Sequence, residues 1–162
     1  MSVQKIQANR ALKVIPSDFC NVPFPNIVEE GTNTTGVSAN TLIDGSATFI
    51  TNNVAVGDIV YNTTSNLAAT VTSVGSETSL TLNDGIFPSV GDSYIVYQAS
   101  AQTGLGNRGC TLYIGGFGSA ELTTTDGDVV VFEGLNTGQF VPVQVLKVGK
   151  SLTTATNIIA LW

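Results

Sequence analysis

Short apolar runs separated by glycine-rich or polar breaks fill the C-terminal third of the chain. They predict strands over residues 111–114, 120–124, 129–132, 140–148 and 156–162, with an Asp126-Gly127 hairpin turn and a loop over 134–138. In residues 140–148 the alternation slips after Val145, which predicts either a bulge or a strand covered on both faces. Pro142 has no amide hydrogen, so this strand is expected to lie at a sheet edge or to begin there.

A second series of apolar runs lies between two polar stretches, residues 31–40 and 98–107. Strands are expected at 46–50, 59–61, 67–74, 79–82 and 93–97, with Val-Gly-Asp turns at 56–58 and 90–92. Several short strands bounded by glycine, aspartate or asparagine predict a small, partly closed barrel or sandwich. The polar stretches on either side indicate that this unit is inserted into another domain.

The N-terminal residues complete the outer part of the predicted fold. Residues 10–15 favour one strand that ends at Pro16, and the alternate prolines of 19–25 favour an extended segment outside any ladder. We therefore expect an all-β fold: a discontinuous antiparallel β-sandwich or barrel-like platform with an inserted small β-barrel or sandwich module. The platform would comprise 1–30 and 101–162, and the inserted module 31–100. Two sequential β domains are the alternative.

Composition indicates a chain that works inside an assembly. Hydrophobic residues make up 43% of the sequence and charged residues only 11%, whereas a free soluble protein usually keeps more charge on its surface. A homo-oligomer, or a subunit covered by neighbours, explains this balance. The net charge is −6 and the six basic residues are scattered, which disfavours nucleic acid and anionic membranes as partners. The polar N-terminus does not resemble a signal peptide, so synthesis in the cytosol is expected.

Most catalytic chemistry lacks its residues in this sequence. The chain has no histidine, which excludes Ser-His-Asp and Cys-His arrangements, and two cysteines cannot build a four-ligand zinc site. Cys20 and Cys110 are expected to be buried free thiols. The Gly-x-Gly-x-x-Gly spacing at 104–109 precedes a strand and not a helix, and Asp126 and Asp128 are interpreted as turn residues. No enzyme activity, catalytic residue, cofactor or metal is predicted.

Five apolar residues are candidates for a partner interface. Phe24, Phe87 and Phe117 lie in predicted loops, and Leu161 and Trp162 end the chain. Each has a second interpretation, because Phe24 can pack on its own domain and Phe87 can plug the end of the predicted barrel. A terminal tryptophan is usually tucked into a core, and that core can belong to this subunit or to a neighbour.

Five segments carry a family resemblance. They are Ala-Leu-Lys-Val-Ile-Pro-Ser-Asp at 11–18, Thr-Leu-Tyr-Ile-Gly-Gly at 111–116, Val-Val-Val-Phe-Glu-Gly-Leu at 129–135, Gly-Gln-Phe-Val-Pro-Val-Gln-Val at 138–145 and Thr-Thr-Ala-Thr-Asn-Ile-Ile-Ala-Leu-Trp at 153–162. Together they resemble the head spike base family of gene transfer agents and tailed phages, and related virion structural proteins. The closing Leu-Trp segment is the most specific part, and residues 31–100 depart from the family pattern.

The resemblance implies a structural virion protein: a capsid decoration or cement protein, or a vertex-spike base subunit, on the capsid surface. Its implied partners are the major capsid protein and copies of itself, with a spike or fibre protein as a further partner. It implies no catalytic residue. The alternatives are a tail, baseplate or fibre adaptor component, and a host-glycan binding module or carboxylate glycosidase.

Overall fold

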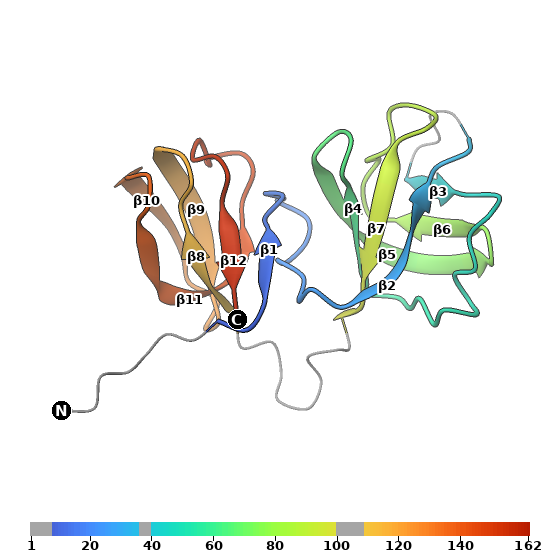
Figure 1. Cartoon of the computed structure of the whole chain (residues 1–162), viewed down its shortest axis with the longest axis horizontal. Coiled ribbons are helices and arrows are strands. Elements are labelled where there is room, and N and C mark those ends of the chain that lie inside the picture. Colours follow the sequence, from blue (N-terminus) through green and yellow to red (C-terminus); the bar gives the residue numbers. More distant parts are fainter. Residues whose placement is uncertain (1–7, 36–39, 100–108) are drawn as a thin grey trace.

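Two antiparallel six-stranded sheets lie side by side in the computed structural model, which describes residues 8–35, 40–99 and 109–162 (Figure 1). The first sheet has the order β1-β12-β8-β11-β9-β10, formed by β1 (Ala11–Lys13), β8 (Cys110–Tyr113), β9 (Gly118–Thr124), β10 (Val129–Leu135), β11 (Phe140–Val148) and β12 (Ile159–Leu161). The second has the order β2-β7-β4-β5-β6-β3, formed by β2 (Ile27–Thr32), β3 (Thr41–Ile43), β4 (Ile59–Asn62), β5 (Leu67–Ser76), β6 (Ser79–Leu82) and β7 (Ser93–Tyr97). The prediction of an all-β fold is confirmed.

One face of the first sheet carries the first hydrophobic core. Ala160 lies opposite Leu112, and Leu112 lies opposite Val141, so these side chains share a face, and all three are fully buried. The chain after β1 runs back along β11, because the amides of Ser17 and Val22 donate to carbonyls of that strand. Strand β1 is shorter than predicted, since the chain leaves the ladder after Lys13 to make this return.

The slip in the apolar pattern of β11 corresponds to a bulge. Its register shifts between Val141 and Val145 against β8, and again between Val145 and Lys147 against β9. Strand β11 lies between β8 and β9, so the edge-strand alternative for Pro142 does not hold for the strand as a whole. Its pairing with β9 begins only at Val145, so Pro142, near the start of the strand, lies on a stretch with a partner strand on one side alone, where a missing amide hydrogen costs least.

The second sheet curls until the chain after β2 meets the end of β3. The amide of Thr34 donates to the carbonyl of Ile43 at 2.8 Å. Next to this contact the buried Asp44 carboxylate accepts hydrogen bonds from the Tyr94 hydroxyl at 2.8 Å and the Ser46 amide at 2.9 Å. A Cβ at residue 31 would collide with the Asp44 carboxylate, so Gly31 permits the closure. The backbone hydrogen bond from Thr34 to Ile43 and the Asp44 carboxylate, which also accepts from the Thr32 amide at 3.4 Å, thereby join the two open edges of the sheet.

Two expectations about the second sheet are wrong. Residues 46–50 form turns and not a strand, because the Phe49 and Ile50 amides donate to the backbone carbonyl and the side chain of Glu77. Strand β2 extends through Gly31 and Thr32 into the stretch that was interpreted as a polar linker, and the short strand β3, which was not expected, directly follows that stretch. The central residue of β3, Leu42, is fully buried in the core.

A third apolar cluster joins the two sheets. Its buried members are Ile15 and Cys20 from the chain after β1, and Ile59, Tyr61, Ala68 and Tyr97 from the second sheet. The Ser17 hydroxyl also donates to the carbonyl of Ala68 at 3.2 Å. The division into a platform, 1–30 with 101–162, and an inserted module, 31–100, stays a prediction; strand β2 begins at Ile27 and belongs to the second sheet.

Candidate functional site: an apolar row on the first sheet

A row of apolar side chains crosses the first sheet on the face opposite its core. Ile159 of β12 lies opposite Tyr113 of β8, and Tyr113 lies opposite Phe140 of β11. Directly opposed residues share a face, and the residues next to them in each strand belong to the buried core. The Tyr113 and Phe140 rings contact at 5.4 Å between centroids, and Phe140 is 51% exposed. We call Ile159, Tyr113 and Phe140 the apolar row.

Leu161, one of the predicted interface residues, lies on the same face as the apolar row. It is opposite Thr111 on one side and Ala11 on the other, one alternation from Ile159 along β12. Beyond Tyr113 and Ile159, on the side away from Leu161, Gly116 and Thr156 form an isolated antiparallel β-bridge. The apolar row together with Leu161 therefore crosses three neighbouring strands, β12, β8 and β11.

Phe117 is the most exposed of the predicted interface residues, at 67%. It stands between Gly116 and Gly118, where the chain runs very close to the loop before β12. A Cβ at Gly118 would collide with the amide of Ala155, and one at Gly116 would collide with the hydroxyl of Thr156. These glycines therefore permit a close approach of the backbone.

Trp162 is tied to its own chain. Its amide donates to the Arg10 carbonyl at 3.0 Å, and its carbonyl accepts from the Asn9 amide at 2.6 Å. The indole packs against the first core and meets the Phe24 ring edge-on at 5.5 Å, with the Arg10 guanidinium above Phe24. Phe24 and Trp162 thus form a half-buried pair within one subunit.

Phe87 does not reach the surface. It is 4% exposed and packs in the second core, with its ring 6.2 Å from that of Tyr94. This buried position agrees with the interpretation of Phe87 as a plug of the barrel end. Phe87 does not lie with the other four predicted interface residues.

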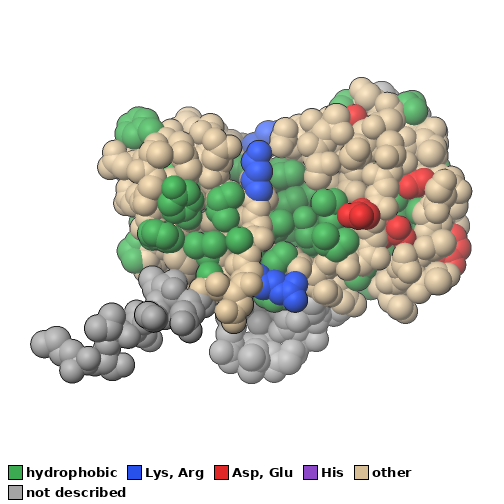
Figure 2. Space-filling model, in the orientation of Figure 1, with side chains coloured by type: hydrophobic (Ala, Val, Ile, Leu, Met, Phe, Trp, Pro, Cys, Tyr) green, Lys and Arg blue, Asp and Glu red, His purple; other side chains and the backbone are tan. Residues whose placement is uncertain are grey.

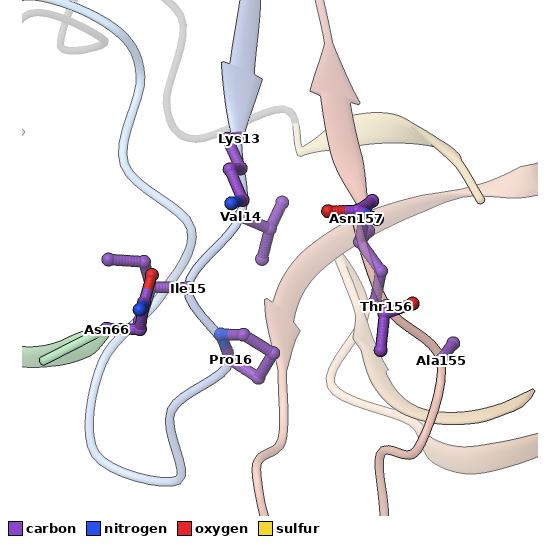
Figure 3. Close-up of a pocket in the computed structure, with 9 residues that line it drawn as sticks. Lys13, Val14, Ile15, Pro16, Asn66, Ala155, Thr156 and Asn157 are labelled. Carbon is purple, nitrogen blue, oxygen red and sulfur yellow. The ribbon is translucent and has the colours of Figure 1, made fainter. Parts of the chain in front are cut away.

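A cavity of about 300 Å³ lies between the sheets, on the side of β1 and β12. It is lined by Lys13, Val14, Ile15, Pro16, Asn66, Ala155, Thr156, Asn157 and Ile158. Figure 3 shows the first four residues lying between Asn66 on one side and residues 155–157 on the other. No carboxylate or thiol lines it, so it offers polar contacts but no acid–base pair. Sequence reasoning missed this cavity because three distant segments build it.

Charge divides unevenly between the sheets. Residues 27–99 contain Glu29, Glu30, Asp44, Asp58, Glu77, Asp84 and Asp92 but no lysine or arginine. Figure 2 shows basic side chains along the boundary between the sheets, acidic side chains over the second sheet, and hydrophobic side chains both over the first sheet and next to the boundary on the side of the second. Lys5, Arg108 and most of the 104–109 motif lie outside the described residues.

Reactive groups are few in the described part of the chain. Cys20 and Cys110 are buried free thiols, as predicted, and burial raises their pKa values to about 11 and about 12. A thiol held in this state is a poor nucleophile. Across the described ranges no group of three potential ligand side chains could hold a metal ion. The same residues contain no helix long and apolar enough to cross a membrane.

Comparisons with known proteins give no match. No family model, no curated protein and no solved structure matches this chain. The resemblance to head spike base and related virion proteins therefore stays a prediction.

Proposed function

We propose that this protein is a non-catalytic structural subunit of a tailed-phage particle, a capsid decoration or vertex-spike base protein. It docks through the apolar row of the first sheet. The observation that carries the proposal is the row itself: Tyr113 and Phe140 lie next to each other on the face turned away from the core, with Ile159 and Leu161 beside them.

Burial of this row in an interface is energetically favourable. Aromatic side chains at the centre of an interface contribute much of the affinity, and a fully buried aromatic side chain contributes about 1.5–3 kcal/mol. A sheet face also suits repetitive docking, because its side chains are held by the ladder and lose little further entropy on binding.

Two further features support an assembled subunit. The chain has 11% charged residues, which is sparse for a surface kept soluble by charge alone. The five segments that resemble virion proteins lie in the first sheet and its connections, and they include Tyr113, Phe140, Ile159 and Leu161. The major capsid protein and copies of this chain are the partners that the resemblance implies.

The test is binding to particles that lack this protein. We expect the purified wild-type chain to co-sediment with such particles, and the double variant Tyr113→Ser/Phe140→Ser to lose most of that binding while keeping its thermal midpoint. Val56→Ser is the matched control, because Val56 is 68% exposed on the second sheet's side of the molecule.

Three outcomes would contradict the proposal in different ways. Equal binding by the wild-type chain and the double variant would reject the apolar row as the docking surface. Binding confined to isolated tails would favour the adaptor alternative. A glycan-array signal without particle binding would favour a glycan-binding module.

A further inference from the structure

Strand β10 ends the first sheet, so one of its edges has no partner strand among the described residues. Figure 1 shows it at the margin of the molecule, far from the second sheet. An open edge presents backbone donors and acceptors that can pair with another strand. Which groups are free follows from the ladder between β9 and β10.

The ladder directs Val129 and Val131 outward. The Thr124 amide donates to the Asp128 carbonyl at 2.9 Å, which makes these two a hydrogen-bonded pair. Bonded and non-bonded pairs alternate along antiparallel strands, and the register places Val129 opposite Thr123, at a non-bonded position. The N–H and C=O groups of Val129 and Val131 therefore point away from β9.

Contacts on the opposite edge of β9 agree with this assignment. The Glu121 carbonyl accepts from the Gly149 amide at 2.8 Å, and the Ser119 carbonyl accepts from the Ala155 amide at 2.9 Å. Residues 119 and 121 thus face away from β10, as the alternation requires.

The three valine side chains at the start of β10 are exposed on both faces of the strand. Val129, Val130 and Val131 are 62%, 47% and 38% exposed, although successive side chains of a strand point to opposite faces. No lysine or proline, the residues that usually protect an edge, occurs from Gly118 to Leu135. The register shifts between Phe132 and Leu135, so the straight, open segment is 129–132.

The charge around this edge has one sign. Asp126 and Asp128 lie at the turn of the β9–β10 hairpin and Glu133 lies in β10, and the hairpin carries no basic residue. A second copy paired at the same edge would bring three more carboxylates to the interface, which opposes self-pairing. A strand with lysine or arginine at its ends is complementary to these carboxylates.

We propose that the free edge of β10 binds a strand of a partner protein that has β-branched residues at its centre and basic residues at its ends. The partner extends the first sheet through the outward backbone groups of Val129 and Val131, in the mode of strand addition. The valine side chains give apolar contact, and the carboxylates of Asp126, Asp128 and Glu133 select the basic flanks. This site is separate from the apolar row and does not depend on which particle the protein joins.

The probe is the eight-residue peptide Lys-Lys-Val-Thr-Val-Thr-Lys-Lys, titrated into the full-length protein and followed by backbone amide NMR. We expect saturable shifts on β10 and new hydrogen-exchange protection of the Val129 and Val131 amides. The Val130 amide already faces β9 and should change least. Affinity should fall as salt is added, because exposed ion pairs are screened.

Two changes to the peptide test the proposal without altering the protein. Glutamates in place of the lysines should weaken binding at least tenfold, because each of several exposed ion pairs contributes a factor of up to about five. Methylation of the central peptide nitrogens should abolish binding.

Val131→Pro in the protein should weaken binding at least fivefold and leave the sheet folded, since an edge strand tolerates proline where its amide faces solvent.

The proposal is overturned if the lysine peptide gives no saturable shifts up to millimolar concentration. It is equally overturned if the glutamate and lysine peptides bind alike, or if the shifts map away from β10. Self-association of the unliganded protein that Val131→Pro abolishes would assign the edge to a second copy.

Discussion

Removal of the hydroxyl from Tyr94 tests how the second sheet is closed. Tyr94 is 1% exposed, and its hydroxyl donates to the Asp44 carboxylate at 2.8 Å. Tyr94→Phe keeps the ring and removes this hydrogen bond. A hydrogen bond to a charged group contributes about 1.5–3 kcal/mol. For a chain of this size the thermal midpoint should fall by about 3–12 °C.

Substitution of Asp44, the hydrogen-bond partner of Tyr94, allows the coupling free energy between the two side chains to be measured. Asp44→Ala leaves the Tyr94 hydroxyl and the Ser46 amide without their acceptor, so it should destabilise more than Tyr94→Phe does. The double variant has no orphaned hydroxyl. Its loss in free energy of unfolding should therefore be smaller than the sum of the two single losses, by about 1–3 kcal/mol.

Urea unfolding followed by circular dichroism measures all four proteins of this cycle. Tyr113→Phe is the matched control, because it removes a tyrosine hydroxyl on the outer face of the first sheet and should change stability by less than about 0.5 kcal/mol. The reasoning is refuted if Tyr94→Phe unfolds at the wild-type urea concentration. It is also refuted if the Asp44→Ala and Tyr94→Phe losses simply add.

Three further predictions concern the first sheet. Gly118→Ala should lower the thermal midpoint strongly, because the new methyl group meets the amide of Ala155; an unchanged midpoint in calorimetry would contradict this. Burial raises the pKa of Cys20 to about 11 and that of Cys110 to about 12, from an ordinary value of 9.0. The folded state therefore holds these protons more tightly, and the stability they contribute is complete below pH 9 and is lost as pH rises through the folded pKa values. Urea midpoints measured from pH 8 to 11 should fall, and they should fall less when both cysteines are alanine. Deletion of residues 160–162 removes most of the strand that joins β1 to β8, so the truncated chain should aggregate or lose its cooperative transition; assembly on particles by that chain would refute this.

Local sequence signals predicted most strands of this fold. The predicted ranges 79–82, 93–97 and 140–148 coincide with β6, β7 and β11, because each combines an apolar pattern with flanking turn residues. The failures occur where one tertiary contact decides the structure. Phe49 and its neighbours alternate like a strand, but Glu77 holds their amides in a turn. Leu42 and Ile43 form only a short apolar pair next to a polar stretch, and their strand is fixed by pairing with β6.

The apolar row could not be read from the sequence. Tyr113, Phe140 and Ile159 belong to strands that are far apart in the chain and become neighbours only through the order β12-β8-β11. Leu161 was a candidate because it ends the chain, not because of the face on which it lies. For Phe87 the loop position left two interpretations open, a contact residue or a plug of the barrel end, and its side chain lies in the second core.

An electron-microscopy map of the phage particle would test the docking surface most directly. If the protein docks through the apolar row, each copy places the outer face of the first sheet, with Tyr113 and Phe140, against a neighbouring subunit of the shell. A map in which these two side chains face solvent, or in which the particle contains no density for this chain, would contradict it.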